Sequence, residues 1–311
     1  MIYFLLKIFV RLALKIFCSD ITVLGADQTE TKGPVLIVSN HPNSFLDAII
    51  IATRFREKIH FLARGDAFTK PIHRKLLGLL NMIPVYRITE GKENLHLNEE
   101  AFRQANQILA KKGIVLIFIE GICLQTHRLQ PFKKGAARIA WANRDTPGFS
   151  VLPLGIAYDS FTRFGKKIKM SVGEPIQPET LFTTGEESKN LRLFNERLFG
   201  EINPRIHIPE KNEEEKKNRR FLFLPALLGY ALHLPVYRLI QTTIRQKTKG
   251  TVFYDSVLFG SLLVCYPLYL FLIGLLLFFL QCPLTVLLFI LILHPVTAFT
   301  AVRYYRVSKK R

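Results

Sequence analysis

The sequence of 311 residues predicts an α/β domain with a mainly parallel sheet, an N-terminal interfacial helix and a C-terminal transmembrane helical hairpin. Short apolar runs alternate with helical stretches between residues 21 and 208, which is typical of α/β folds. The first 17 residues are apolar but carry regularly spaced basic side chains. Two adjacent apolar runs near the C-terminus are each long enough to cross a bilayer.

Residues 1–20 predict the interfacial helix. Lys7, Arg11 and Lys15 follow one another at four-residue spacing, so they share one helical face. Such a helix lies in the membrane interface rather than spanning it. A secretory signal would need an uninterrupted apolar core and a small-residue cleavage site. We therefore expect this helix to stay attached.

The segment 21–208 predicts the α/β domain. Residues 35–38, 60–63 and 114–118 are short apolar runs of the kind that form buried parallel strands. Residues 45–55 and 99–112 lie between such runs and have helical patterns. The order strand, helix, strand, helix favours a parallel sheet covered by helices.

The remainder of the chain predicts a linker and membrane segments. Residues 209–220 are too highly charged to bury a core and form a charged linker. Residues 221–250 form a membrane-associated segment, re-entrant or lying on the surface. Residues 251–311 form the hairpin, from apolar runs at 256–280 and 283–301, with a basic tail. The alternative for these runs is a pair of buried helices in a soluble bundle.

The charges around the hairpin predict its orientation. Basic residues precede and follow the two apolar runs, and the turn between them carries no charge. By the positive-inside rule both flanks are cytoplasmic. We expect an integral membrane protein with the α/β domain on the cytoplasmic face, at the inner membrane if the source is bacterial.

The composition limits the partners. Lys and Arg number 43 against 24 Asp and Glu, a net charge of +19 that suits nucleic acid, phosphorylated metabolites or anionic lipid. No nucleic-acid motif accompanies the charge, so we expect no nucleic-acid partner. The four cysteines are too widely spaced for a zinc ribbon or redox pair, which indicates a reducing compartment. The histidines lack ligand spacing, so no metal site is predicted.

The strongest local signal is the polar turn after the first buried strand. His41 stands at the carboxyl end of that strand, where open α/β sheets bind ligands, and Asp47 lies at the start of the following helix. A neutral imidazole can remove the proton of a hydroxyl, and a carboxylate on its other nitrogen fixes the tautomer. The pair predicts a general base with its orienting group. The alternative is a helix-cap arrangement.

The order of further segments resembles the glycerol-phosphate and lysophosphatidate acyltransferases. Asn40 and His41 with Asp47 resemble the block that carries the catalytic His and Asp of that family. Residues 83–87, Ile-Pro-Val-Tyr-Arg, are similar to its block ending in an arginine that binds the acceptor phosphate, which implies that role for Arg87. A planar guanidinium can hold phosphate oxygens bidentately. The alternative for Arg87 is a surface carboxylate partner.

Three later segments extend the resemblance to about residue 176. Residues 118–121, Phe-Ile-Glu-Gly, resemble a Phe-Pro-Glu-Gly block over the acceptor site, which implies substrate contacts for Glu120 and Gly121. Residues 151–155 are similar to a strand linked to acyl-chain binding, which implies an acyl pocket at Pro153. Residues 172–176 resemble the Gly-x-Pro-Ile tail of the family. Alternatively, Glu120 is solvated in a turn and Pro153 only shapes a strand.

The chain departs from the family pattern in three places. Five residues separate His41 from Asp47 where four are usual, a His-x5-Asp variant that resembles a branch with fungal glycerol-phosphate and dihydroxyacetone-phosphate acyltransferases. Residues 119 and 122–123 replace the usual Pro and Thr-Arg. Arg128, Lys133 and Lys134 are the candidates to replace the missing arginine as substrate-binding groups. The two lysines could equally face anionic lipid.

The resemblance implies an O-acyltransferase of phospholipid biosynthesis, similar to 1-acylglycerol-3-phosphate O-acyltransferases. The acyl chain would pass from acyl-CoA or acyl-ACP to the hydroxyl of a lysophosphatidate-type acceptor, with no cofactor beyond that co-substrate. Membrane lipids and a glycerophospholipid acceptor are the expected partners. The alternatives are a glycerol-3-phosphate or dihydroxyacetone-phosphate acyltransferase, a hydrolase or transacylase using the same histidine, and a non-catalytic membrane-tethered adaptor that binds anionic lipid.

Overall fold

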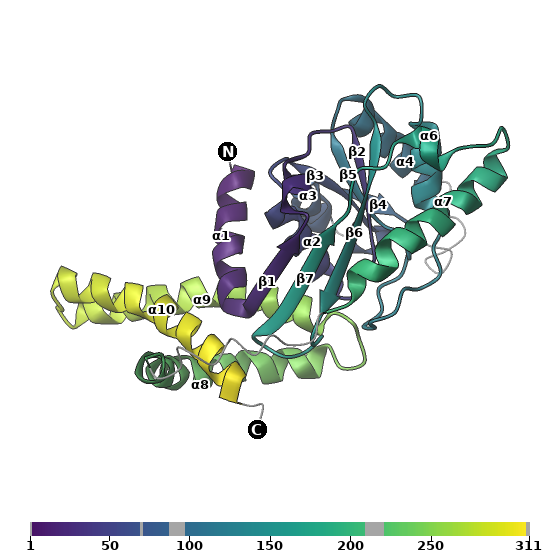
Figure 1. The fold of residues 1–311 in the computed structure, drawn as a ribbon. Coiled ribbons are helices and arrows are strands. Elements are labelled where there is room, and N and C mark those ends of the chain that lie inside the picture. The colour runs from purple at the N-terminus through teal and green to yellow at the C-terminus, as the bar shows by residue number, and fades with distance from the viewer. Residues whose placement is uncertain (1, 69–70, 87–96, 209–220, 309–311) are drawn as a thin grey trace.

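The computed structural model describes residues 2–68, 71–86, 97–208 and 221–308. A seven-stranded sheet lies between layers of helices, and three long helices extend from it (Figure 1). The strands are β1 (Cys18–Leu24), β2 (Val35–Ser39), β3 (Ile59–Arg64), β4 (Met82–Val85), β5 (Ile114–Phe118), β6 (Ser150–Tyr158) and β7 (Lys166–Val172). Their order in the sheet is β1-β7-β6-β2-β5-β3-β4.

The sheet is mixed but mostly parallel. Among the strands of the described residues, β6 and β7 pair antiparallel and the other neighbours pair parallel, so β1 and β7 run opposite to the other five. All five residues of β2 are buried, because helices cover both faces of the sheet at its centre. The predicted α/β class and the strands predicted at 35–38, 60–63 and 114–118 are confirmed.

The two faces of the sheet are covered by different helices. One core cluster joins the sheet to α1 (Ile2–Phe17), α2 (Phe45–Arg54) and the start of α9 (Tyr254–Phe279). The other joins it to α4 (Leu97–Ala110), α5 (Gly135–Ala142) and α7 (Glu187–Ile202). The shorter helices are α3 (Pro71–Leu79) and α6 (Pro178–Leu181), and the 3-10 turns are Ala26–Glu30, Gly65–Phe68 and Asn203–Ile206. The helices predicted at 45–55 and 99–112 are therefore confirmed as α2 and α4.

Helix α1 turns two of its three basic side chains inward. Lys7 Nζ donates to the carbonyl oxygens of Phe55 and Arg56, and Arg11 Nε donates to that of Thr53. These carbonyls stand at the C-terminal end of α2, where the helix leaves acceptors without partners. Apart from Lys15, the surface that α1 exposes is instead apolar, made of Phe4, Leu5, Leu6, Ile8, Phe9 and Leu12. The basic face thus joins two helices.

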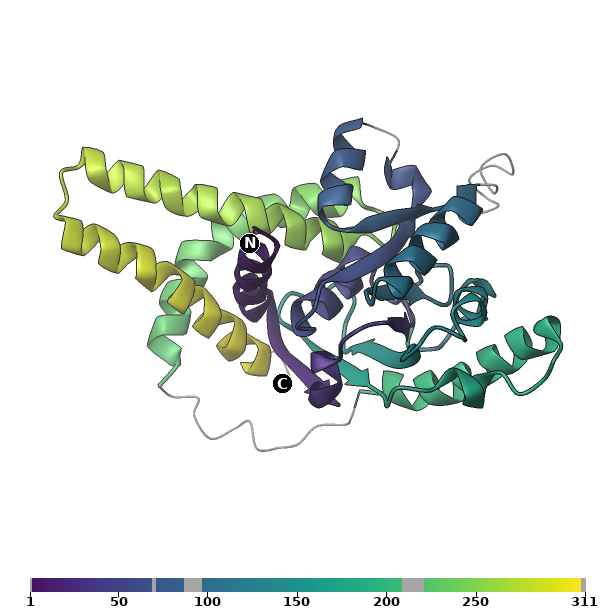
Figure 2. The ribbon, with the colours of Figure 1, turned by 90° about the horizontal axis from the view of Figure 1, so that it is seen from above.

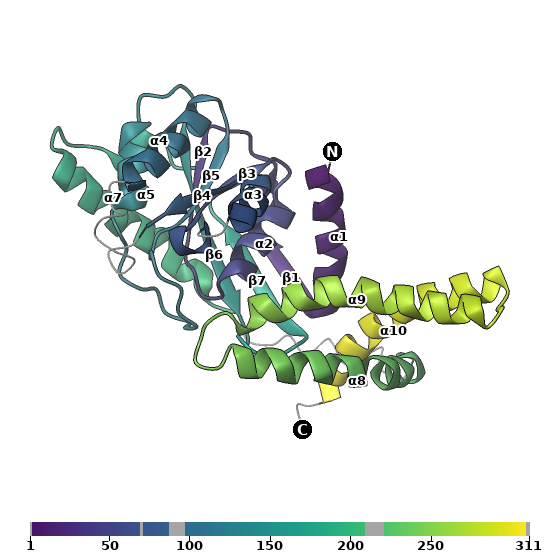
Figure 3. The same cartoon turned by 180° about the vertical axis from the view of Figure 1, so that it is seen from behind.

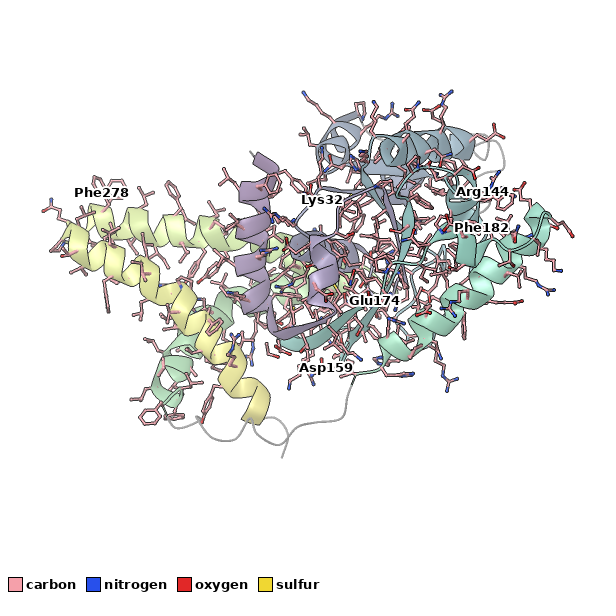
Figure 4. The ribbon with its side chains drawn as sticks, turned by 45° about the horizontal axis from the view of Figure 1, so that its top comes forward. Lys32, Arg144, Asp159, Glu174, Phe182 and Phe278 are labelled. Atoms are coloured by element: carbon pink, nitrogen blue, oxygen red, sulfur yellow. The ribbon has the colours of Figure 1, made fainter. Side chains whose placement is uncertain are left out.

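Three C-terminal helices are long and apolar enough to cross a membrane: α8 (Phe223–Lys247), α9 and α10 (Leu284–Ser308). Figure 2 shows α9 and α10 side by side, extending away from the sheet. Figure 4 labels Phe278 near the far end of α9, where its exposed side chain points away from the α/β domain. The two apolar runs of the predicted hairpin are therefore helical, and the structure adds a third candidate span.

The segment predicted as re-entrant or surface-lying is one continuous helix, α8, with Pro235 inside it. Figure 3 shows α8 lying across the C-terminal part of α10. The two backbones pack closely at Gly229, where an added Cβ would lie 2.0 Å from the carbonyl oxygen of Thr297. Packing against α10 accounts for a single helix despite the proline, since neighbouring helices stabilise such interruptions.

The first turns of α9 belong to the core of the α/β domain. Tyr254, Leu258 and Phe259 are buried in the cluster that contains α1 and α2. The Phe259 ring packs edge-on against the Phe17 ring, with the ring centroids 5.1 Å apart. The predicted charged linker, 209–220, lies outside the described residues. The domain boundaries at 20, 208, 220 and 250 stay predictions. The first residues of the hairpin, at the start of α9, are part of the α/β domain core.

Candidate active site

The candidate site lies where β2, β5 and β6 end. These strands are parallel neighbours, so their carboxyl ends meet at one edge of the sheet. The chain leaves β2 at Ser39, passes through a polar loop containing His41 and enters α2 at Phe45. Phe118 ends β5 and Tyr158 ends β6. The topology therefore brings these residues together from three distant parts of the sequence.

His41 and Asp47 form a pair at this edge. His41 Nδ1 lies 2.9 Å from Asp47 Oδ2. The Asp47 side chain is completely buried, whereas the His41 side chain is 17% exposed. The hydrogen-bond network assigns the proton to Nδ1, which leaves Nε2 as an acceptor. The buried carboxylate can thus orient an imidazole that substrate can still reach.

Two further donors hold the Asp47 carboxylate. The hydroxyl of Tyr158 donates to Oδ1 at 2.5 Å, and the backbone N–H of Asn43 donates to Oδ2 at 2.7 Å. Burial, reinforced by the Asp47 charge, raises the pKa of Tyr158 well above its usual value. The phenol therefore stays protonated and serves as a permanent donor. A buried carboxylate with three partners is fixed in orientation.

Phe118 and Glu120 fix the histidine from the other side. The Phe118 ring stacks on the His41 imidazole with centroids 3.8 Å apart. Glu120 accepts the backbone N–H of His41 through Oε2 and that of Gln130 through Oε1, each at 2.8 Å. Burial raises the pKa of the Glu120 carboxyl, although these two N–H groups oppose the shift. Glu120 thus ties the His41 loop to the segment after β5.

A buried carboxylate, a reachable imidazole and a braced loop at a strand end are what general-base catalysis requires. Residues 20–157, which contain all of these groups except Tyr158, match the sequence model of the family described as Acyltransferase. The matched segment, residues 20–157, is similar to an acyltransferase domain and is given that name. The enzyme is therefore an acyltransferase.

Other comparisons are less informative. The crystal structure of the 1-acyl-sn-glycerophosphate (LPA) acyltransferase PlsC from Thermotoga maritima is similar at 22% sequence identity and a TM-score of 0.44, covering 65% of this chain and 81% of that one. No curated protein sequence matches the chain.

Two predicted substrate-binding residues of the acyltransferase domain are engaged by the fold. The Asn40 side chain donates to the Ile156 carbonyl and accepts the Ile156 N–H, both at 2.9 Å, so it extends the pairing of β2 with β6. Gly121 has φ +61°, and a Cβ there would lie 2.8 Å from Lys133 Cγ. Glycine is therefore favoured where the chain turns beside Lys133. Both residues shape the site.

The predicted acyl-pocket residue, Pro153, is buried in β6 opposite Val38. A Cβ on Gly173 would lie 2.8 Å from its ring, so the two chain segments touch. A separate apolar cavity of about 780 Å³ lies between α1, α8, α9 and α10. That cavity suits hydrocarbon, but it is not lined by Pro153, His41 or Asp47.

The predicted basic residues of the acyltransferase domain follow Glu120 in the chain. Arg128, Lys133 and Lys134 are exposed, and the backbone N–H of Lys133 donates to the Ile119 carbonyl at 2.8 Å. Their segment is the one that Glu120 anchors through Gln130. Arg87 lies outside the described residues, two positions after the carboxyl end of β4.

Sequence reasoning missed several groups that contact Asp47 or the loop between His41 and Asp47. Tyr158 carried a weak signal, because it follows residues 151–155, which resemble a strand of the family. Cys123, whose Sγ accepts the Ser44 N–H at 3.0 Å, was noted only as a departure from the family pattern. Asp255 and Ser256 gave no signal, since they stand more than 200 positions away at the start of an apolar run.

Proposed function

We propose that the enzyme transfers a fatty acyl chain from a coenzyme A or acyl carrier protein thioester to the hydroxyl of a lysophosphatidate-type acceptor, with His41 as general base. The observation that carries this proposal is the 2.9 Å contact between His41 Nδ1 and the buried Asp47 carboxylate, within the segment that matches the Acyltransferase family. A dedicated orienting carboxylate is of use to a catalytic imidazole and of none to a lipid-binding adaptor.

The chemistry follows from the tautomer. His41 Nε2 removes the proton of the acceptor hydroxyl while the oxygen attacks the thioester carbonyl. The imidazolium that forms is stabilised by the Asp47 carboxylate, which accepts the Nδ1 proton in a hydrogen bond. When the tetrahedral intermediate collapses, the C–S bond breaks, the ester remains, and the imidazolium returns its proton to the leaving thiolate. His41 ends the cycle neutral, and no covalent acyl-enzyme is needed.

An anionic acceptor requires basic groups near His41. Glu120 connects the His41 loop to the segment that carries Arg128, Lys133 and Lys134, so these exposed cations are the candidates to hold the acceptor phosphate. Arg87 joins them through its resemblance to the phosphate-binding arginine of the family. Glu120 itself acts by holding the two segments together.

The membrane location is part of the proposal. The helices α8, α9 and α10 have the length and composition of membrane spans, and the exposed surface of α1 is apolar apart from Lys15. We propose that α9 and α10 span the bilayer as a hairpin, and that α8 and α1 lie along its interface. Basic residues flank the α9–α10 hairpin on both sides, which favours the cytoplasmic face for the acyltransferase domain. The acyl product would then enter the lipid directly.

The test is an acceptor and donor panel with purified enzyme in detergent. Labelled palmitoyl is offered from coenzyme A and from acyl carrier protein, to lysophosphatidate and to glycerol 3-phosphate in parallel. A diacyl product that depends on lysophosphatidate supports the proposal. Product only with glycerol 3-phosphate, as the His-x5-Asp resemblance would allow, moves the enzyme one step upstream. No transfer to any acceptor, or free fatty acid alone, would refute the proposed reaction.

A further inference from the structure

We infer that the N-terminal turn of α9 is a working part of the active site, in which Asp255 and Ser256 position the loop between His41 and Asp47. This inference rests on the proposed function, because it assigns positioning residues to the His41 reaction. It goes beyond that function in making a candidate membrane helix necessary for the catalytic geometry.

The loop needs an external support. Five residues separate His41 from Asp47, and one of them, Ser44, has φ 55°, a conformation that L-residues rarely adopt. Such a conformation persists only where the surroundings determine it. Asn43 is the critical member of the loop, because its backbone N–H donates to the same Asp47 oxygen that faces His41. A displacement of Asn43 would therefore move the carboxylate.

Helix α9 supplies that support through three hydrogen bonds. The Asn43 side chain donates to Asp255 Oδ2 at 2.8 Å. The Ser256 hydroxyl donates to the Asn43 carbonyl at 3.2 Å and accepts the Leu46 N–H at 3.1 Å. Asn43 is thus held by its side chain and by its carbonyl, and the start of α2 is held beside it.

Asp255 is itself anchored to the sheet. Its carboxylate pairs with the Lys166 ammonium at the start of β7, and both side chains are buried. Lys166 Nζ also lies 5.3 Å from the centre of the Phe17 ring. Buried charges persist only when paired, so this ion pair fixes the position of the α9 N-terminus relative to the sheet. The chain of contacts runs from Lys166 through Asp255 and Asn43 to Asp47 and His41.

The test compares Ser256→Ala with a matched control, Ser261→Ala, which removes a hydroxyl from the same helix away from the loop. Misplacing a catalytic group by about 1 Å can cost on the order of 100-fold in rate. We expect kcat to fall about 10-fold to 100-fold in Ser256→Ala, with KM for both substrates and the melting temperature close to those of the control. Ser256→Thr, which keeps the hydroxyl, should recover most of the loss.

A double variant separates positioning from general weakening of the fold. If Ser256 acts through the carboxylate, Ser256→Ala should cost no further activity in an Asp47→Ala background. Equal losses in both backgrounds would overturn the inference, as would an unchanged kcat in Ser256→Ala. A melting temperature that falls in Ser256→Ala without recovery of activity in Ser256→Thr would also overturn it. His41→Ala, measured beside these, identifies failure of the proposed function separately: its full activity would refute the base role itself.

Discussion

At the scale of single residues, the site is a buried carboxylate surrounded by donors. The Asp47 carboxylate accepts hydrogen bonds from Tyr158, Asn43 and His41. Of these three donors, only His41 is partly exposed. Burying a charge is costly unless hydrogen bonds replace the lost water, so each donor stabilises the fold as well as the site. The buried Glu120 carboxylate is stabilised in the same way, by hydrogen bonds from two backbone N–H groups.

The Tyr158 hydroxyl offers a direct measure of this stabilisation. Tyr158→Phe removes a donor from a buried charge, and we expect it to lower the free energy of unfolding by about 1.5–3 kcal/mol. Tyr86→Phe, at a partly exposed position, is the matched control and should change stability little. Denaturant unfolding in detergent measures both. Equal stability of the two variants would contradict the role given to Tyr158.

The raised pKa of Glu120 predicts a pH dependence. The folded protein binds the Glu120 proton more tightly than the unfolded chain, so this contribution is complete below the ordinary value of 4.5 and is lost as the pH rises through the raised pKa. Glutamine does not titrate, so Glu120→Gln does not lose this stability as the pH rises. The unfolding free energy of Glu120→Gln relative to wild type should therefore increase between about pH 4 and pH 7. A difference in unfolding free energy between Glu120→Gln and wild type that stays constant over this pH range would refute the prediction.

At the scale of elements, strand ends and helix ends decide where the chemistry lies. The parallel pairing of β2 with β5 and β6 places His41, Glu120 and Tyr158 at one edge. The C-terminal end of α2 is completed by Lys7 and Arg11 from α1, so the helix that carries Asp47 is held at both ends by distant parts of the chain.

The contact between α1 and α2 is open to test. Lys7→Met keeps most of the side-chain volume but leaves the Phe55 and Arg56 carbonyls without their donor. We expect a loss of about 1–3 kcal/mol in the free energy of unfolding. Lys15→Met, on the same helix at an exposed position, should have almost no effect. Thermal unfolding of both variants measures the difference. A Lys7→Met protein as stable as Lys15→Met would be inconsistent with a stabilising contact between Lys7 and the end of α2.

Much of the fold could be predicted because hydrophobic periodicity is local. Local sequence alone predicted the buried runs of β2, β3 and β5 and the helical patterns of α2 and α4. The inward turn of Lys7 and Arg11 was not, because spacing shows a shared face but not what the face contacts. Asp255 and Ser256 were missed for the same reason. Their function depends on where α9 docks, which is a tertiary property.

At the scale of the whole molecule, the acyltransferase domain and the candidate membrane helices share a core. The start of α9 packs with α1 and α2, while its far end extends away from the sheet (Figures 1 and 2). With the exposed apolar surface of α1 on the same side, the arrangement suits an enzyme whose catalytic edge is held at a fixed position relative to the bilayer.

Membrane insertion of the C-terminal helices predicts a simple fractionation result. The protein should remain in the membrane pellet after alkaline carbonate extraction and enter solution only with detergent. Alkaline carbonate weakens the electrostatic contacts that hold peripheral proteins, but it does not extract helices buried in the hydrocarbon core. Immunoblotting of the pellet and supernatant provides the measurement. Release by carbonate alone would mean that α9 and α10 do not span the bilayer.

The most direct test of the central claim is acyl transfer by His41→Ala measured beside His207→Ala, which removes an exposed imidazole elsewhere. If His41 is the general base, its loss should reduce kcat by about 10²–10⁴-fold while His207→Ala keeps wild-type activity. Transfer by His41→Ala at the rate of His207→Ala would contradict the account.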